Sequence, residues 1–83
     1  MSSRVFLKPG VFSRWRQFAR LKQEAVAQDC GWTQGEQSHV ERGARSVART
    51  KLDIMVGAIT KALEADGLPA PDLQDLIAES RAQ

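Results

Sequence analysis

The stretch QEAVAQDCGWTQGEQSHVERG, residues 23–43, decides the expected fold of this chain. Its first eight residues place a valine, an alanine and a cysteine on one side of a short helix, and Gly31 follows as a left-handed terminator. Thr33 is a good N-cap for a second helix that ends at Gly43, and Glu36 completes a capping box at its start. The stretch therefore predicts two short helices joined by a tight turn.

The second predicted helix is unusual because almost none of its side chains favours burial. Residues 34–42 combine Gln, Gly, Glu, Ser, His and Arg with a single aliphatic residue, Val40. Such a helix is stable when a few contacts anchor it and its outer face lies in the major groove of DNA, where amides and hydroxyls meet base edges. We therefore expect Val40 to anchor this helix and the polar side chains to contact DNA.

The segment before this stretch also carries a helical pattern. Pro9 and Gly10 are typical of a helix entry, and aromatic residues recur at helical spacing up to about residue 21. This spacing favours core packing of the aromatic rings over base stacking on single strands, and the lone cysteine is expected to be a small buried hydrophobe. The expected core residues of these kinds are Trp15, Phe18, Trp32 and Cys30.

The segment after residue 43 predicts two further helices. Residues 44–51 form a basic connection, in which a short helical turn is expected around Val47. Apolar residues then recur at i, i+3, i+7, i+10 and i+11, which predicts a helix over about residues 50–65. Gly67 and two prolines separate this helix from an acidic final one. The apolar positions are Leu52, Met55, Ile59, Ala62 and Leu63 in the first helix, and Leu73, Leu76 and Ile77 in the second.

The composition fits one globular domain. The chain has 83 residues, of which 42% are hydrophobic and 27% are charged, and this is enough for one modest core. No segment alternates apolar and polar residues over the length of a strand, and no hairpin turn signal occurs. We therefore expect an all-α fold, a compact domain of five to six helices.

Charge is distributed unevenly along the chain, although the net charge is only +2. Residues 1–51 carry ten basic and four acidic residues, a net charge of +6, whereas residues 52–83 carry two basic and six acidic residues, a net charge of −4. A basic half beside an acidic half is typical of a domain that binds a polyanion at one end. A merely uneven solvated surface is the alternative explanation.

Residues 23–43 resemble the helix-turn-helix of the phage Cro and repressor family, often called the XRE family. The resemblance extends over roughly residues 12–65, and in overall size the chain also resembles the small Kor-type repressors of plasmids. It implies a DNA-binding domain over residues 1–68, preceded by an N-terminal arm over residues 1–10. The acidic segment 69–83 lies outside the resemblance and is expected to form a C-terminal dimerisation helix. The matching residues are Gln23, Ala27, Gly31, Thr33, Gln34 and the sequence Val40, Glu41, Arg42 and Gly43.

Two residues depart from the family pattern. Gln37 stands where the family has an aliphatic residue, and Gly35 is a poor helix former in the first turn of the helix. Either Gln37 forms hydrogen bonds at the edge of the core with Trp32 covering the gap, or the helix is rolled so that Gln37 joins the base-reading face. A buried amide without partners costs about 1 to 3 kcal/mol, which favours a satisfied or half-exposed Gln37.

The resemblance also implies which residues contact DNA. The base-reading positions fall on Gln34, Ser38 and His39, joined by Gln37 if the helix is rolled, and a glutamine can bridge N6 and N7 of adenine. The phosphate-contacting positions lie at the start of the first helix of the pair, at the cap of the second and after it. They are Gln23, Thr33, Arg42, Arg45 and Arg49. Solvated side chains without a role in binding are the alternative for each of these residues.

Two expectations concern contacts within the protein. The resemblance implies an ion pair between Arg16 and Glu41 that ties the N-terminal helix to the end of the recognition helix. In the acidic tail, Leu73, Leu76 and Ile77 form too small an apolar stripe to stabilise a free helix. The tail is therefore expected to pack across a two-fold axis or against the partner's long helix, and folding back onto its own domain is the alternative.

The expected function is that of a sequence-specific, duplex-DNA-binding transcriptional repressor of phage or plasmid type, which acts as a homodimer on a palindromic operator. Two alternatives stay open: an antitoxin that autoregulates the operon of a toxin-antitoxin pair, and a helical protein-interaction module. The expected partners are double-stranded operator DNA and a second copy of the chain, with another regulatory protein as a further option.

Several other classes of function lack support in the sequence. No nucleophile-base pair, carboxylate pair or phosphate-cradling loop indicates an enzyme, and no motif indicates a cofactor. A single cysteine and a single histidine give no metal-ligand spacing and no internal disulfide. No apolar run approaches the roughly 20 residues of a membrane span, and residues 1–10 lack the apolar centre of a signal peptide. We therefore expect a cytoplasmic, nucleoid-associated protein with no cofactor, no metal and no membrane partner.

Overall fold

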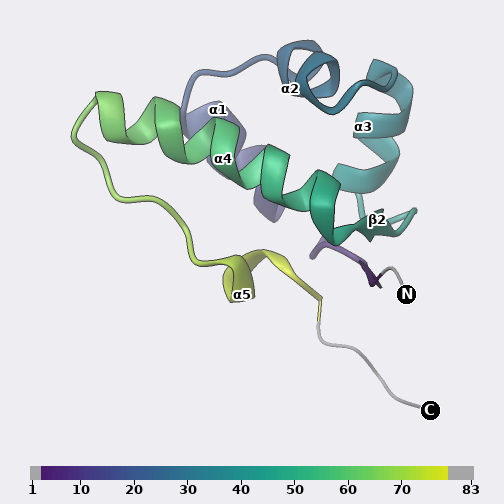
Figure 1. The fold of residues 1–83 in the computed structure, drawn as a ribbon. Helices are drawn as coiled ribbons and strands as arrows, with labels where there is room; N and C mark the ends of the chain where they lie inside the picture. Colours follow the sequence, from purple (N-terminus) through teal and green to yellow (C-terminus); the bar gives the residue numbers. More distant parts are fainter. Residues whose placement is uncertain (1–2, 79–83) are drawn as a thin grey trace.

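The computed structural model describes residues 3–78 of the chain, and most of these residues are helical (Figure 1). The elements in chain order are β1 (Arg4–Val5), α1 (Val11–Phe18), α2 (Gln23–Cys30), α3 (Gln34–Glu41), β2 (Val47–Ala48), α4 (Arg49–Ala65) and α5 (Leu73–Leu76). Within residues 3–78 the number of helices, five, agrees with the sequence expectation. The expectation of a purely α fold is wrong, because β1 and β2 form a small antiparallel sheet.

The turn between α2 and α3 forms as the sequence predicts. Gly31 ends α2 with a φ of +79°, in the left-handed region that favours glycine. The Thr33 hydroxyl accepts a hydrogen bond from the Glu36 backbone N–H at 3.1 Å, and a Glu36 carboxylate oxygen accepts one from the Thr33 backbone N–H at 3.0 Å. The predicted capping box is therefore confirmed.

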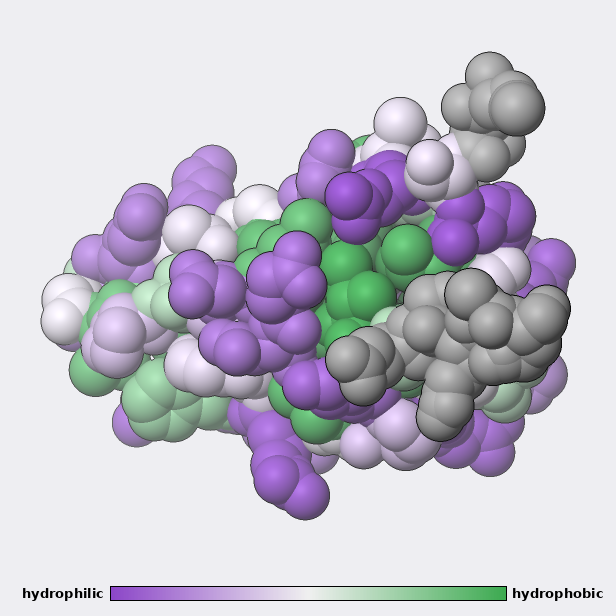
Figure 2. All heavy atoms as spheres, turned by 90° about the horizontal axis from the view of Figure 1, so that it is seen from below, coloured by the Kyte–Doolittle hydropathy of each residue, from purple (hydrophilic) through white to green (hydrophobic). Residues whose placement is uncertain are grey.

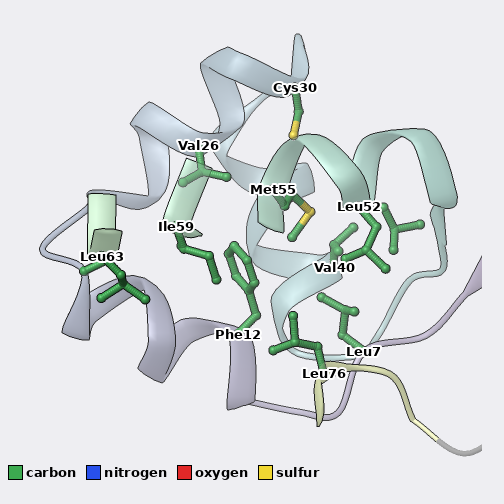
Figure 3. Close-up of a cluster of buried hydrophobic side chains, with 12 residues drawn as sticks. Leu7, Phe12, Val26, Cys30, Val40, Leu52, Met55, Ile59, Leu63 and Leu76 are labelled. Carbon is green, nitrogen blue, oxygen red and sulfur yellow. The ribbon is translucent and has the colours of Figure 1, made fainter. Parts of the chain in front are cut away.

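The hydrophobic core gathers around α4 (Figure 3). The predicted stripe of α4 is confirmed, since four of its five residues are fully buried and Ala62 is partly buried against the core; the four are Leu52, Met55, Ile59 and Leu63. Val40 is buried as the expected anchor of α3. The other residues of the cluster come from the N-terminal segment, α1 and its C-cap, α2, β2 and α5: Leu7, Phe12, Ala19, Val26, Cys30, Val47 and Leu76.

One aromatic prediction is wrong. Phe18 is 51% exposed, whereas Trp15 and Trp32 are partly buried against the core. The buried face of α1 carries Phe12 and Arg16, and Phe18 lies two residues beyond Arg16 and so off that face. Its ring packs edge-on against Trp15, with 5.8 Å between the ring centroids. The helical pattern could not fix the end of α1 to within one turn.

The small sheet contradicts two predictions that were based on local sequence. β1 pairs with β2 in antiparallel register, with Arg4 opposite Ala48 and Val5 opposite Val47. The helical turn expected around Val47 is therefore wrong, and residues 4–8 are not a free arm. The two strands are only two residues long and lie more than forty residues apart, so no local pattern announces their pairing.

The N-terminal segment passes close to the end of α3. Gly43 has a φ of +75°, and a Cβ added to it would lie 2.8 Å from the backbone oxygen of Leu7. Any residue with a side chain would therefore be strained by its backbone conformation and would also clash with the segment. Gly43 thus ends α3 and allows Leu7, which is 1% exposed, to enter the core.

The C-terminal tail returns to this N-terminal segment. The Lys8 backbone N–H donates to the Leu76 carbonyl at 2.8 Å, the Ala78 backbone N–H donates to the Phe6 carbonyl at 2.8 Å, and Leu7 forms an antiparallel bridge with Ile77. Leu76 is fully buried in the core of its own domain.

The prediction that Leu73, Leu76 and Ile77 form a dimer contact is therefore wrong for Leu76, and the alternative of a tail folded onto its own domain is confirmed within residues 71–78. Leu73 and Ile77 are partly buried against the same core. Seen from below, the side on which α5 lies, hydrophobic residues gather at the centre of the face and hydrophilic ones surround them (Figure 2). Within residues 3–78, no helix has both the length and the apolar character of a membrane span.

Candidate nucleic-acid interface

The predicted ion pair between Arg16 and Glu41 is present at the centre of a buried polar cluster. The Arg16 Nε atom lies 3.0 Å from Oε2 of Glu41, and the side chains of these two residues are only 11% and 1% exposed. A second guanidinium nitrogen, Nη2, donates to Oε1 at 3.2 Å. Arg16 also donates through Nη1 to the carbonyl of Leu21, so it holds together α1, the connection from α1 to α2, and the end of α3.

Three further side chains donate hydrogen bonds to the Glu41 carboxylate. They are Ser13 of α1 at 2.7 Å, Gln23 of α2 at 3.1 Å and Gln37 of α3 at 2.9 Å. A buried carboxylate needs such partners, because an unpaired buried charge is strongly destabilising. Within residues 3–78, no buried side-chain nitrogen or oxygen lacks a hydrogen-bond partner. The cluster therefore joins three helices at one point.

Gln37 belongs to this cluster and not to the surface. Its side chain is fully buried, its Nε2 donates to Glu41 and its Oε1 accepts a hydrogen bond from Nε1 of Trp32 at 2.8 Å. The expectation of a hydrogen-bonded Gln37 with Trp32 beside it is confirmed. The prediction that Gln37 reads bases is wrong, because a fully buried amide cannot reach a base edge.

The opposite side of α3 is exposed and polar. With Gln37, Val40 and Glu41 buried, the helical period turns the remaining positions outward. Gln34 and His39 are exposed and Ser38 is half-buried. We call the surface formed by Gln34, Gly35, Ser38 and His39 the outer face of α3. The three polar residues predicted to read bases thus share one face, while the fourth candidate lies inside.

Gln34 is tied to the buried cluster through Gln23. Its Nε2 donates to Oε1 of Gln23 at 3.2 Å, and Gln23 in turn donates to the carboxylate of Glu41. An ionised carboxylate accepts hydrogen bonds only, so it orients the Gln23 amide with its nitrogen inward and its oxygen outward. Gln34 therefore turns its nitrogen toward Gln23, and its Oε1 and second N–H are left for another partner.

The residues predicted to contact phosphates lie at the start of α2, at the N-cap of α3 and in the chain that follows α3. Thr33, Arg42, Arg45 and Arg49 are exposed and Gln23 is half-buried. Arg45 is engaged in an exposed ion pair with Glu36, with 3.7 Å between Nη1 and Oε2. Exposed pairs of this kind contribute only about 0 to 1 kcal/mol, so Arg45 can exchange Glu36 for a phosphate at little cost.

A hollow of about 240 Å³ lies between α3 and the start of α4. It contains two cations that the sequence reasoning missed, Arg4 and Lys51. Arg4 donates to the hydroxyl of Ser46 at 2.9 Å, and Lys51 donates to the carbonyl of Cys30. Arg4 reaches this place only through the pairing of β1 with β2, so no local signal in the sequence could have placed it there. The other residues that line the hollow are Trp32, Glu36, Val40, Arg45, Ser46, Ala48 and Thr50.

Two ionisable groups near this surface have shifted pKa values. The hydrogen bond from the Thr33 backbone lowers the pKa of Glu36, with help from the Thr33 hydroxyl and Arg45. Burial raises the pKa of the Cys30 thiol, so the thiol stays protonated and behaves as the predicted small hydrophobe. Within residues 3–78, no group of three or more His, Cys, Asp or Glu side chains could hold a metal ion.

The described surface therefore combines a polar face of α3, which is anchored from inside, with exposed arginines in the chain that follows this helix. Amide, hydroxyl and imidazole groups can form directional hydrogen bonds, and guanidinium groups can pair with anions. Comparisons of the chain with known protein families, curated proteins and solved structures find no match.

Proposed function

We propose that the protein is a sequence-specific, duplex-DNA-binding transcriptional repressor that acts as a homodimer on a palindromic operator. In this proposal α2 and α3 form a helix-turn-helix of the Cro and repressor type, and α3 is the recognition helix. The observation that carries the proposal is the hydrogen bond between Gln34 and Gln23, which holds an exposed glutamine of α3 in one orientation from the buried Glu41.

The shape and polarity of α3 support this function. The major groove of B-DNA, about 12 Å wide, admits one α-helix, and its floor presents hydrogen-bond donors and acceptors. The outer face of α3 carries an amide, a hydroxyl and an imidazole at helical spacing, while the inner face is anchored by buried residues. This division fits a helix that rests on a rigid domain and presents its polar face to a groove.

The fixed orientation of the Gln34 amide favours one base. Adenine offers an acceptor at N7 and a donor at N6, whereas guanine offers two acceptors, N7 and O6. Gln34 keeps an oxygen and one N–H available, which match adenine in a bidentate pair. We therefore propose that Gln34 selects adenine in each half-site, with Ser38 and His39 contacting neighbouring bases.

The basic border positions the helix on the duplex. Arg42, Arg45 and Arg49 follow α3 and are exposed, so they can contact phosphates without regard to sequence. Two recognition helices in a dimer would enter successive major grooves, about 34 to 36 Å apart. An operator that overlaps a promoter would then be closed to RNA polymerase, so the proposed repression is steric.

Selection of bound duplexes from a random pool tests this function. We expect an enriched palindrome whose half-sites are about 10 base pairs apart, centre to centre. A parallel selection with Gln34→Ala should give the same palindrome with one adenine in each half-site no longer enriched. Failure to enrich any duplex sequence at low salt would contradict the proposal.

A further inference from the structure

Gln37 and Trp32 form a matched pair at the inner side of α3. A glutamine at a fully buried position is costly unless both ends of its amide find partners. Both ends do: Nε2 donates to Glu41 at 2.9 Å and Oε1 accepts from Trp32 at 2.8 Å. The Trp32 indole comes from the turn between α2 and α3, so this amide connects the turn to the end of the recognition helix.

The chemistry of the two partners permits one orientation of the Gln37 amide. An ionised carboxylate accepts only, and an indole N–H donates only. Gln37 must therefore present its nitrogen to Glu41 and its oxygen to Trp32. An aliphatic side chain at this position would make contacts without direction, and only the capping box and the other hydrogen bonds of Glu41 would then oppose a roll of α3 about its axis. Two short hydrogen bonds of opposite polarity restrict that roll.

Trp32 is itself held from a second side. The ammonium group of Lys51, in the first turn of α4, lies 5.8 Å from the centroid of the Trp32 ring and donates to the carbonyl of Cys30 at the end of α2. A cation at this distance is attracted by the aromatic face. The turn, the end of α2 and the start of α4 are thus fixed relative to the indole that binds Gln37.

We propose that Gln37 is a positioning residue that sets the rotation of α3, and with it the direction in which Gln34, Ser38 and His39 face. The link runs from Trp32 through Gln37 to Glu41, and from Glu41 through Gln23 to Gln34. Its consequence for base reading rests on the proposed function, whereas the link itself is a property of the free protein.

The link is tested first without DNA, by the indole N–H signals of the two tryptophans in an NMR spectrum. Trp15 lies on α1 outside the link and serves as an internal reference. In Gln37→Met, which removes both polar ends at similar volume, the Trp32 signal should shift upfield and its hydrogen exchange should become at least about ten-fold faster. The Trp15 signal should stay in place.

The consequence for DNA is tested with the duplex obtained by selection. Gln37→Met and Trp32→Phe should each reduce the ratio of operator affinity to scrambled-duplex affinity by about ten-fold or more, because a rolled helix misdirects several base contacts. Affinity for scrambled duplex should change by less than about two-fold, since phosphate contacts do not depend on this rotation. Ile59→Val is the matched control, because it loosens the same core without touching the link and should leave the ratio unchanged.

Three results would overturn the inference: an unchanged Trp32 signal in Gln37→Met, a ratio that stays at the wild-type value in both variants, or an equal fall of the ratio in Ile59→Val. If Gln37→Met does not fold, Trp32→Phe decides by the same ratio, because it removes only one end of the link. If no duplex is enriched by the wild type, the proposed function fails, and the Trp32 signal in the variant still decides whether the link exists.

Discussion

At the scale of single residues, the Glu41 carboxylate organises the domain. It is 1% exposed and receives hydrogen bonds from Ser13, Arg16, Gln23 and Gln37, which lie on three helices. Three of these four donors make a second contact: Arg16 donates to the Leu21 carbonyl, Gln37 accepts from Trp32 in the turn, and Gln23 accepts from Gln34 at the surface. The loss of one donor should therefore disturb contacts in more than one helix.

Arg16→Ala should destabilise the fold strongly. The substitution leaves the Glu41 charge buried without its cationic partner, and breaking a buried pair in this way costs about 3 to 5 kcal/mol. Urea unfolding followed by circular dichroism measures the loss. Arg14→Ala, an exposed arginine on the same helix, should change the free energy of unfolding by no more than about 0.5 kcal/mol. Equal midpoints for Arg16→Ala and wild type would contradict the role of the pair.

Gln34→Ala and His39→Ala should each weaken operator binding by about 1 to 3 kcal/mol and leave binding to scrambled duplex nearly unchanged. Both side chains are exposed on the outer face of α3, so neither substitution removes a core contact. Fluorescence anisotropy with the two labelled duplexes measures the difference. Equal losses on both duplexes would mean that α3 does not read bases.

At the scale of the elements, α3 depends on its two ends. Its start is closed by the capping box of Thr33 and Glu36, and its end by Gly43, whose backbone lies against the N-terminal segment. A helix of eight residues is too short to be stable alone, so these ends and the buried anchors hold it in place. Changes at the ends should therefore act on α3 before they act on the whole fold.

The capping box should make stability depend on pH in the acidic range. The pKa of Glu36 is lower in the folded protein, because the carboxylate accepts a hydrogen bond from the Thr33 backbone N–H. The contribution of Glu36 to the free energy of unfolding is therefore complete above the ordinary carboxyl pKa. This contribution is lost as the pH falls from about 5 through the lowered pKa of Glu36. Glu36→Gln, which can still complete a capping box, should match wild type at pH 7 and lose less stability between pH 7 and pH 3. Urea midpoints at the two pH values measure this, and identical losses would count against it.

The arginines after α3 should contribute to the salt dependence of DNA binding. Arg42→Ala and Arg45→Ala should weaken operator and scrambled duplex alike, and each should reduce the slope of log K against log salt by about 1 per contact in a protomer. Lys61→Ala removes one positive charge from the opposite part of α4 and should leave the slope unchanged. Salt titrations on both duplexes give the slopes. If the slope does not change in one of the two arginine variants, the arginine substituted in that variant does not contact phosphate.

At the scale of the whole molecule, the two chain ends close the domain together. Residues 4–8 lie between β2 on one side and the tail on the other, with backbone hydrogen bonds to both. Leu7 and Leu76, one from each end, are buried in the same core as α4 (Figure 3). The tail is therefore part of the fold of its own domain.

Truncation after Leu68 should destabilise the domain itself. It removes Leu76, and even the single substitution Leu76→Ala should cost about 2 to 5 kcal/mol as a large-to-small change in the core. Gln74→Ala, at an exposed position of α5, should cost little and serves as the control. Thermal unfolding measures the loss, and sedimentation of the folded variants reports association separately. A truncated protein of wild-type stability that only loses its partner would instead support a tail that serves the dimer.

Much of this architecture follows from the sequence alone. Local patterns predict four features correctly, because each depends on residues at most four positions apart. These features are the bounds of α2, the left-handed Gly31, the capping box and the buried stripe of α4. The resemblance to a family predicts the pairing of Arg16 with Glu41. The helix period also placed Gln34, Ser38 and His39 on one face, although it left the rotation of that face undecided.

Only the tertiary structure decided the rest, because it depends on residues far apart in the chain. Gln37 could have been exposed or buried until Trp32 and Glu41 were seen to satisfy both ends of its amide. The strand pairing of residues 4–5 with residues 47–48 and the return of the tail to residues 6–8 are contacts across forty or more residues. Local propensity carries no information about such partners, since the free energy that fixes them comes from packing and hydrogen bonds formed only when the chain has folded.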